Sequence, residues 1–77
     1  MRLMAEPEEA EESPVGAVGW VTVSIPPDGA GEVLLPVRGG SEAFAAWADV
    51  PIARNTQVMV VERISARSVL VVPFPHT

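Results

Sequence analysis

Five short apolar stretches, separated by glycine, proline, aspartate and asparagine, occupy residues 15–74 of this chain. Most of them alternate apolar and polar residues with a period of two, which is typical of half-buried β-strands. Short strands joined by turns, with no crossover helix between them, leave few architectures for a chain of this length. The pattern predicts an all-β fold over residues 15–75, either a small β-barrel or a sandwich.

The turn residues set the expected strand boundaries. In the first strand Val21, Val23 and Ile25 are expected on one face, and in the fourth strand Val58 and Ile64 share a face. Because the other faces of the fourth and fifth strands are apolar too, these strands are either covered on both sides or meet a partner. The five strands are expected at residues 15–25, 31–38, 41–48, 57–64 and 67–74.

The third stretch, residues 41–48, fits a strand or one to two helical turns. In a helix Phe44 and Trp47 would share a face, whereas in a strand they point to opposite sides. The neighbouring strands favour the strand interpretation. Asn55, in the loop that follows, suits a left-handed turn position.

Acidic charge is concentrated at the N-terminus. Residues 1–13 hold five glutamates against Arg2, a net charge of −4, whereas residues 14–77 carry only −1. A segment rich in Glu, Ala and Pro buries too little apolar area to offset the entropy of ordering, so residues 1–14 are interpreted as a flexible acidic linker. Neither part has the basic stripe of a phosphate-binding domain, so no nucleic-acid partner is expected.

The residues that catalysis requires are scarce. The chain has no cysteine and no lysine, and its single histidine, His76, is next to the C-terminus. We therefore expect no enzyme activity, no metal site and no cofactor. The longest apolar run, residues 69–74, is far shorter than the roughly 20 residues that span a bilayer. No signal peptide is visible.

The large aromatic side chains are the candidates for a contact surface. Trp20, Phe44 and Trp47 are predicted to bind a partner, because large rings supply much of the energy at protein interfaces. Core packing would explain the same residues. The alternative function is OB-type binding of single-stranded nucleic acid or an oligosaccharide, in which these rings would stack on the ligand beside the arginines.

The order of motifs resembles the soluble C-terminal OB-like barrel of NfeD-type membrane proteins. The likeness covers about residues 15–74, and Asn55 stands where that family usually has glycine. It rests on Gly16-Ala17-Val18-Gly19, Pro27-x-Gly29, residues 31–38 before Gly39-Gly40, residues 42–46, Ile52-Ala53-Arg54-Asn55-Thr56 before residues 57–61, and residues 70–74.

The resemblance implies a small five-stranded OB-like β-barrel over residues 15–75, attached to membrane helices that lie outside this chain. It also implies association with a stomatin- or flotillin-like scaffold protein, or self-association, and a role in regulating membrane proteases or membrane organisation. Some relatives carry a separate ClpP-type serine protease domain, which this chain lacks. The domain is expected to be membrane-associated through the full-length protein, on its cytoplasmic side.

Overall fold

Turn residues separate five strands in the computed structural model, which describes residues 13–74. Residues 13–74 contain no helix, so none is long and apolar enough to cross a membrane. The third stretch is a strand, as predicted. The strands are β1 (Val18–Val23), β2 (Gly31–Val37), β3 (Gly40–Trp47), β4 (Gln57–Ser65) and β5 (Ser68–Pro73).

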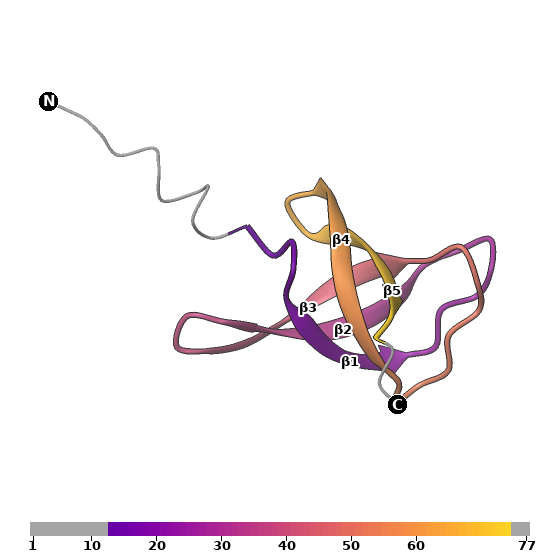
Figure 1. Cartoon of the computed structure of the whole chain (residues 1–77), viewed down its shortest axis with the longest axis horizontal. Helices are drawn as coiled ribbons and strands as arrows, with labels where there is room; N and C mark the ends of the chain where they lie inside the picture. Colours follow the sequence, from indigo (N-terminus) through magenta and orange to yellow (C-terminus); the bar gives the residue numbers. More distant parts are fainter. Residues whose placement is uncertain (1–12, 75–77) are drawn as a thin grey trace, which may run out of the picture.

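The strands close into a barrel in the order β1-β2-β3-β5-β4 (Figure 1). All neighbouring pairs are antiparallel except β3 and β5, which run parallel. The prediction of an all-β, five-stranded barrel is confirmed. Since closure gives every strand two neighbours, this short chain keeps no full-length unpaired edge.

Alternate residues along the strands point into the barrel and form its core. Phe44 is 7% exposed and lies inside the barrel, together with valines of β1, β2, β4 and β5. Valine suits this role because its branched side chain packs well on a pleated surface. The buried core consists of Val21, Ile25, Val33, Leu35, Phe44, Ala46, Ala48, Ile52, Val58, Val60, Val69 and Val71.

Two predicted inward residues, Val23 and Ile64, are exposed instead. The register of β1 against β2 shifts between Val21 and Val23, and the register of β4 against β5 shifts at two places, between Val60 and Ser65. An extra residue in one strand reverses which face the following side chains occupy. The prediction of strict alternation through these positions was therefore wrong. The first strand also begins at Val18 rather than at residue 15.

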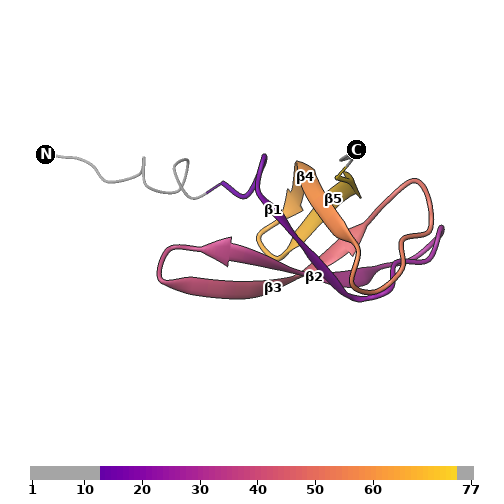
Figure 2. The same cartoon turned by 60° about the horizontal axis from the view of Figure 1, so that its bottom comes forward.

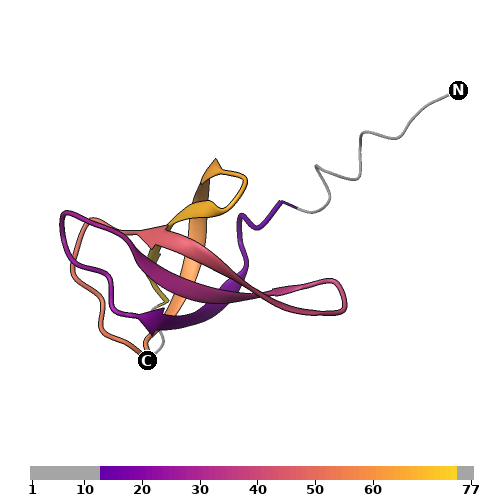
Figure 3. The same ribbon diagram turned by 180° about the vertical axis from the view of Figure 1, so that it is seen from behind.

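The barrel has two different ends (Figures 1, 2 and 3). At one end lie residues 13–17, the β2–β3 turn and the β4–β5 turn, and the backbone N–H of Gly16 donates to the Val60 carbonyl there (2.8 Å). We call it the arginine end, because Arg38, Arg63 and Arg67 lie there. At the other, the loop end, residues 24–30 and 48–56 run side by side, joined by two hydrogen bonds between Ile25 and Ile52.

Local backbone chemistry shapes these ends. Asn55 takes a positive φ of 73° in the loop before β4, as its sequence position predicted, and its N–H donates to the Val21 carbonyl (2.7 Å). The β1–β2 ladder ends at Trp20 and Leu34, so Pro36 lies where β2 pairs with β3 alone and the missing proline N–H costs no ladder bond. Of the predicted acidic linker, residues 1–12 lie outside the described residues.

Candidate functional site

Trp47, the last residue of β3, lies on the outside of the barrel and is 40% exposed. It pairs in register with Leu70 of β5, and Val72 follows Leu70 on the same face. Val72 pairs with Met59 of β4, which pairs in turn with Val18 of β1. These five residues, Trp47, Leu70, Val72, Met59 and Val18, form an apolar surface over four strands that we call the Trp47 patch.

Trp20 is also on the outside, at 52% exposed. It lies opposite Leu34 of β2, and two exposed apolar side chains at paired positions make a continuous contact area. Val18 and Trp20 share the outer face of β1, so this pair continues the Trp47 patch around the barrel. Two of the three aromatic residues singled out in the sequence therefore belong to one outer surface.

Phe44, the third of these residues, points the other way. Its ring is buried in the core at the arginine end. Phe44 and Trp47 point to opposite faces of β3, because side chains alternate along a strand. It therefore supports the barrel from within, and the structure does not bring it together with Trp20 and Trp47.

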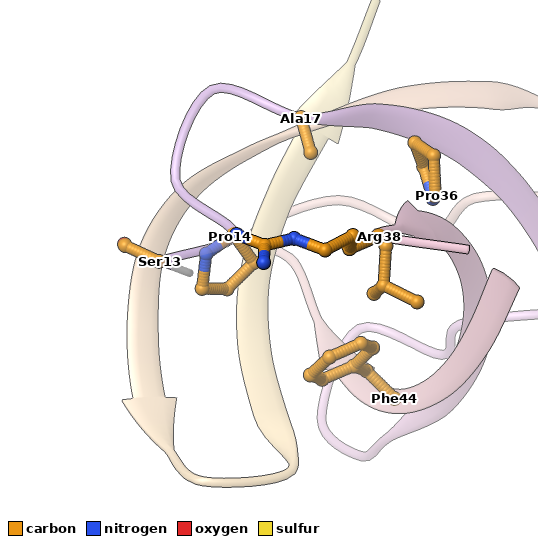
Figure 4. A pocket seen from close by; sticks show the side chains of 7 residues that line it. Ser13, Pro14, Ala17, Pro36, Arg38 and Phe44 are labelled. Carbon is orange, nitrogen blue, oxygen red and sulfur yellow. The ribbon is translucent and has the colours of Figure 1, made fainter. Parts of the chain in front are cut away.

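A pocket of about 290 Å³ opens beside Phe44 at the arginine end. It lies between the N-terminal segment, which supplies Ser13, Pro14 and Ala17, and the β2–β3 hairpin. In Figure 4 the Arg38 side chain extends across the pocket towards Pro14, above the Phe44 ring. The pocket therefore combines an apolar wall with a permanent positive charge.

A second hollow adjoins the first, because both are lined by Pro14, Val37 and Phe44. Its charged residues are Glu42, Arg63 and Arg67. Arg67 pairs with Glu42, and its guanidinium carbon lies 6.0 Å from the centre of the Phe44 ring. Arg63 donates its Nε–H to the Ser65 carbonyl (3.2 Å).

The loop end has a third hollow with a different character. Its walls are Ser24, Pro26 and Ala30 from one loop and Pro51 and Ala53 from the other, closed beneath by the Ile25–Ile52 bridge. Among the residues that the structure describes, none that lines this hollow is charged. Its lining is mostly apolar, with the Ser24 hydroxyl as a polar group.

The described surfaces offer apolar contact area and arginine side chains. Within residues 13–74 no three His, Cys, Asp or Glu side chains gather where they could hold a metal ion. His76 falls outside the described residues. Arg63 and Arg67 flank one turn in the sequence, but the sequence analysis missed that Arg38, from a distant hairpin, lies beside them.

Known proteins place this barrel in a family. A search of curated proteins found no match. Among solved structures, the chain is similar to the soluble domain of the NfeD protein YuaF from Bacillus subtilis, with 30% identity and a TM-score of 0.75. That match covers 90% of this chain and 83% of the other. The family model of the NfeD C-terminal domain matches residues 18–72, which span β1 to β5 up to Val72, and the chain therefore belongs to the NfeD C-terminal domain family.

Proposed function

We propose that this barrel is a non-catalytic protein-interaction domain of a membrane-tethered NfeD-like protein. In this proposal it contacts a stomatin- or flotillin-type scaffold protein, or another copy of itself, through the Trp47 patch. Such contact would regulate a membrane protease or the organisation of the membrane around the scaffold. The cytoplasmic side is the proposed location.

The observation that carries the proposal is the exposed apolar exterior of the Trp47 patch. Trp47 is partly exposed next to Leu70, Val72 and Met59. Contact of this apolar surface with water is unfavourable, so covering it with a partner would release free energy. Tryptophan is also the residue type that most often dominates binding energy when it becomes buried at an interface.

The family supports the tethering part of the proposal. The similar structure is described as the soluble domain of an NfeD protein, wording that implies a further, less soluble part of that protein. The scaffold partners are proposed from the family resemblance of the sequence. The Trp47 patch is an apolar surface that such a partner could cover.

The test compares two variants for binding to a purified stomatin-like scaffold protein by isothermal titration calorimetry. Trp47→Ala is expected to weaken binding by at least about tenfold, as truncation of an interface hot spot does. Ile64→Ala removes an exposed apolar side chain outside the patch, and it should leave binding unchanged. Equal binding by the two variants, with the barrel intact by circular dichroism, would remove the patch from the function.

Self-association is tested in the same variants by sedimentation velocity. If the partner is a second copy, the wild-type sedimentation coefficient rises with concentration, and Trp47→Ala abolishes the rise. A sedimentation coefficient that stays constant across concentrations in both proteins leaves the scaffold as the proposed partner.

The OB-type alternative, binding of a single-stranded nucleic acid or an oligosaccharide, has weaker support. Stacking platforms of nucleic-acid binders put exposed rings inside a basic groove. Here the exposed rings, Trp20 and Trp47, belong to the outer apolar surface. Three of the four arginines of residues 13–74 lie instead at the arginine end, around the buried Phe44. No change in tryptophan fluorescence with an oligonucleotide at low salt would agree with this assignment.

A further inference from the structure

The β2–β3 hairpin extends beyond the strands that flank it. Strand β1 pairs with β2 only as far as Leu34, and β5 pairs with β3 only from Ala45 onwards. The pairing of β2 with β3 continues beyond both points, to Val37 and Gly40. Residues 35–43 therefore project from the barrel as a two-stranded ribbon (Figures 1 and 3). No strand in the described part of the chain pairs with either edge of this ribbon.

The two edges of the ribbon differ in their backbone groups. On the β2 edge Pro36 has no N–H, and proline protects an exposed edge from pairing. On the β3 side, the Ala45 N–H donates to the Arg67 carbonyl (2.9 Å), so the backbone groups of Ala45 face β5. Because these directions alternate along a strand, Ser41 and Ala43 turn their N–H and C=O groups to the same side. Both residues are exposed, so β3 has an open edge there with two donors and two acceptors.

A groove lies beside this open edge. It is the hollow of about 270 Å³ between β3 and the β4–β5 turn, and Val37 and Phe44 form part of its apolar wall. Its charged lining residues are Arg63, Arg67 and Glu42, which together carry a net charge of +1. Arg67 pairs with Glu42, whereas no carboxylate within residues 13–74 forms an ion pair with Arg63. The groove therefore has a guanidinium that an added carboxylate would complement.

We propose that the open edge of β3, residues 41–43, binds an extended acidic segment of a partner protein by β-strand addition. The segment exchanges backbone hydrogen bonds with Ser41 and Ala43, and its alternate side chains enter the groove, where a carboxylate pairs with Arg63. The backbone donors and acceptors select an extended chain, and the charge of the groove selects an acidic one. The site is separate from the Trp47 patch and goes beyond the proposed function.

A second copy of the chain fits this edge less well. Two such edges pair most fully when Ser41 of each copy lies opposite Ala43 of the other. In this antiparallel register the Glu42 side chains of the two copies lie directly opposite each other, and like charges in that position are destabilising. Charge therefore favours a different, acidic partner.

Amide hydrogen exchange on the ¹⁵N-enriched chain tests the edge directly. In the free protein the amides of Ser41 and Ala43 should show little protection, whereas those of Glu42 and Phe44, which face β2, should be protected. The probe is a blocked pentapeptide of alternating valine and glutamate. At ten times its dissociation constant, exchange at Ser41 and Ala43 should slow by about tenfold. Absence of binding at millimolar peptide, or binding without this protection, would overturn the proposal.

The backbone and charge contributions are tested separately. A peptide methylated at every backbone nitrogen keeps its carboxylates but cannot donate to β3, and it should bind about tenfold more weakly. Arg63→Glu should weaken binding of the unmodified peptide by about fivefold at low salt. Arg54→Glu, the same charge change at the loop end, should leave binding unchanged. Equal binding of the two peptides, or equal binding by the two variants, would contradict strand addition by an acidic segment.

The free protein shows whether another occupant already covers the edge. Protection of Ser41 and Ala43 that rises with protein concentration would assign the edge to a second copy, and protection at every concentration would assign it to the chain itself. Either result would overturn the proposal. Trp47→Ala should bind the peptide as the wild type does, so loss of scaffold binding in that variant is distinguishable from failure of the edge. Loss of peptide binding in Trp47→Ala would show that the two sites are not separate.

Discussion

Gly31 is the first residue of β2, next to the point where the pairing between β1 and β2 ends. Replacing Gly31 with alanine should separate the two strands there. A Cβ at this position would lie 2.5 Å from the Ser24 carbonyl oxygen, closer still to the Val23 carbonyl oxygen, and 2.8 Å from Cγ1 of Ile25. The two oxygens belong to the backbone and cannot rotate aside. The strand end must therefore move.

The expected cost follows from these distances. Overpacking a tight site costs about 1–3 kcal/mol, and contacts with fixed backbone put Gly31→Ala at the upper end, about 3 kcal/mol. The lower chain entropy of alanine in the unfolded state returns about 0.5–1 kcal/mol. A net loss of about 2 kcal/mol corresponds to a melting temperature lower by about 8–16 °C for a domain of this size.

Gly40→Ala is the matched control. Gly40 is also the first residue of a strand, but a Cβ there meets no atom within 4 Å. The free energy of unfolding of the Gly40→Ala variant should equal that of the wild type or exceed it by about 0.5 kcal/mol. Urea unfolding of both variants, followed by circular dichroism, gives the comparison. Equal midpoints for Gly31→Ala and Gly40→Ala would refute the close approach of β1 and β2 on which the reasoning rests.

Three further substitutions probe the core, the loop and the surface. Leu35→Ala removes a fully buried side chain and should lower the free energy of unfolding by about 2–5 kcal/mol, whereas Leu34→Ala, on the exposed face of the same strand, should change it by under about 1 kcal/mol in the same urea titration. Asn55→Val places a β-branched residue at a positive φ and should lower the melting temperature by several degrees, with Asn55→Gly close to wild type; equal losses in both would contradict the left-handed conformation. Glu42→Gln breaks the exposed ion pair with Arg67 and should cost under about 1 kcal/mol in low salt and nothing in 1 M salt, and a loss that persists in 1 M salt would contradict a purely electrostatic role.

Most of the fold could be predicted from local patterns. Turn residues and alternation located all five strands, and the strand interpretation of residues 41–48 placed Phe44 and Trp47 on opposite faces, as the structure has them. Alternation failed for Val23 and Ile64 because a bulge changes which face of the sheet the adjoining residues occupy. Bulges depend on how two strands fit together, and neither strand alone encodes them.

The candidate site was harder to predict than the fold. Trp20 and Trp47 could be selected by residue type, but whether Phe44 points inward depends on which face of β3 meets the core. The arginine end could not be predicted, because Arg38 and Arg63 become neighbours only once two separate hairpins close side by side. Such long-range pairing depends on barrel topology rather than on spacing along the chain.

The short ladders that close the barrel divide it into two folding pieces. Strands β1, β2 and β3 form a meander of local pairings. The β4–β5 hairpin attaches to it through short ladders at Val18–Trp20 and Ala45–Trp47, with further hydrogen bonds between residues 16–17 and Val60. Local pairings form sooner than distant ones, so the hairpin should dock last and detach first. Detachment leaves β1 and β3 each with a free edge that the hairpin of a second molecule fits, which is the geometry of domain swapping. Trp47 belongs to β3 and Leu70 to β5, so the two residues lie on opposite sides of the β3–β5 ladder. A ligand that binds both should therefore stabilise the closed barrel, whereas a ligand that binds Trp47 alone should not.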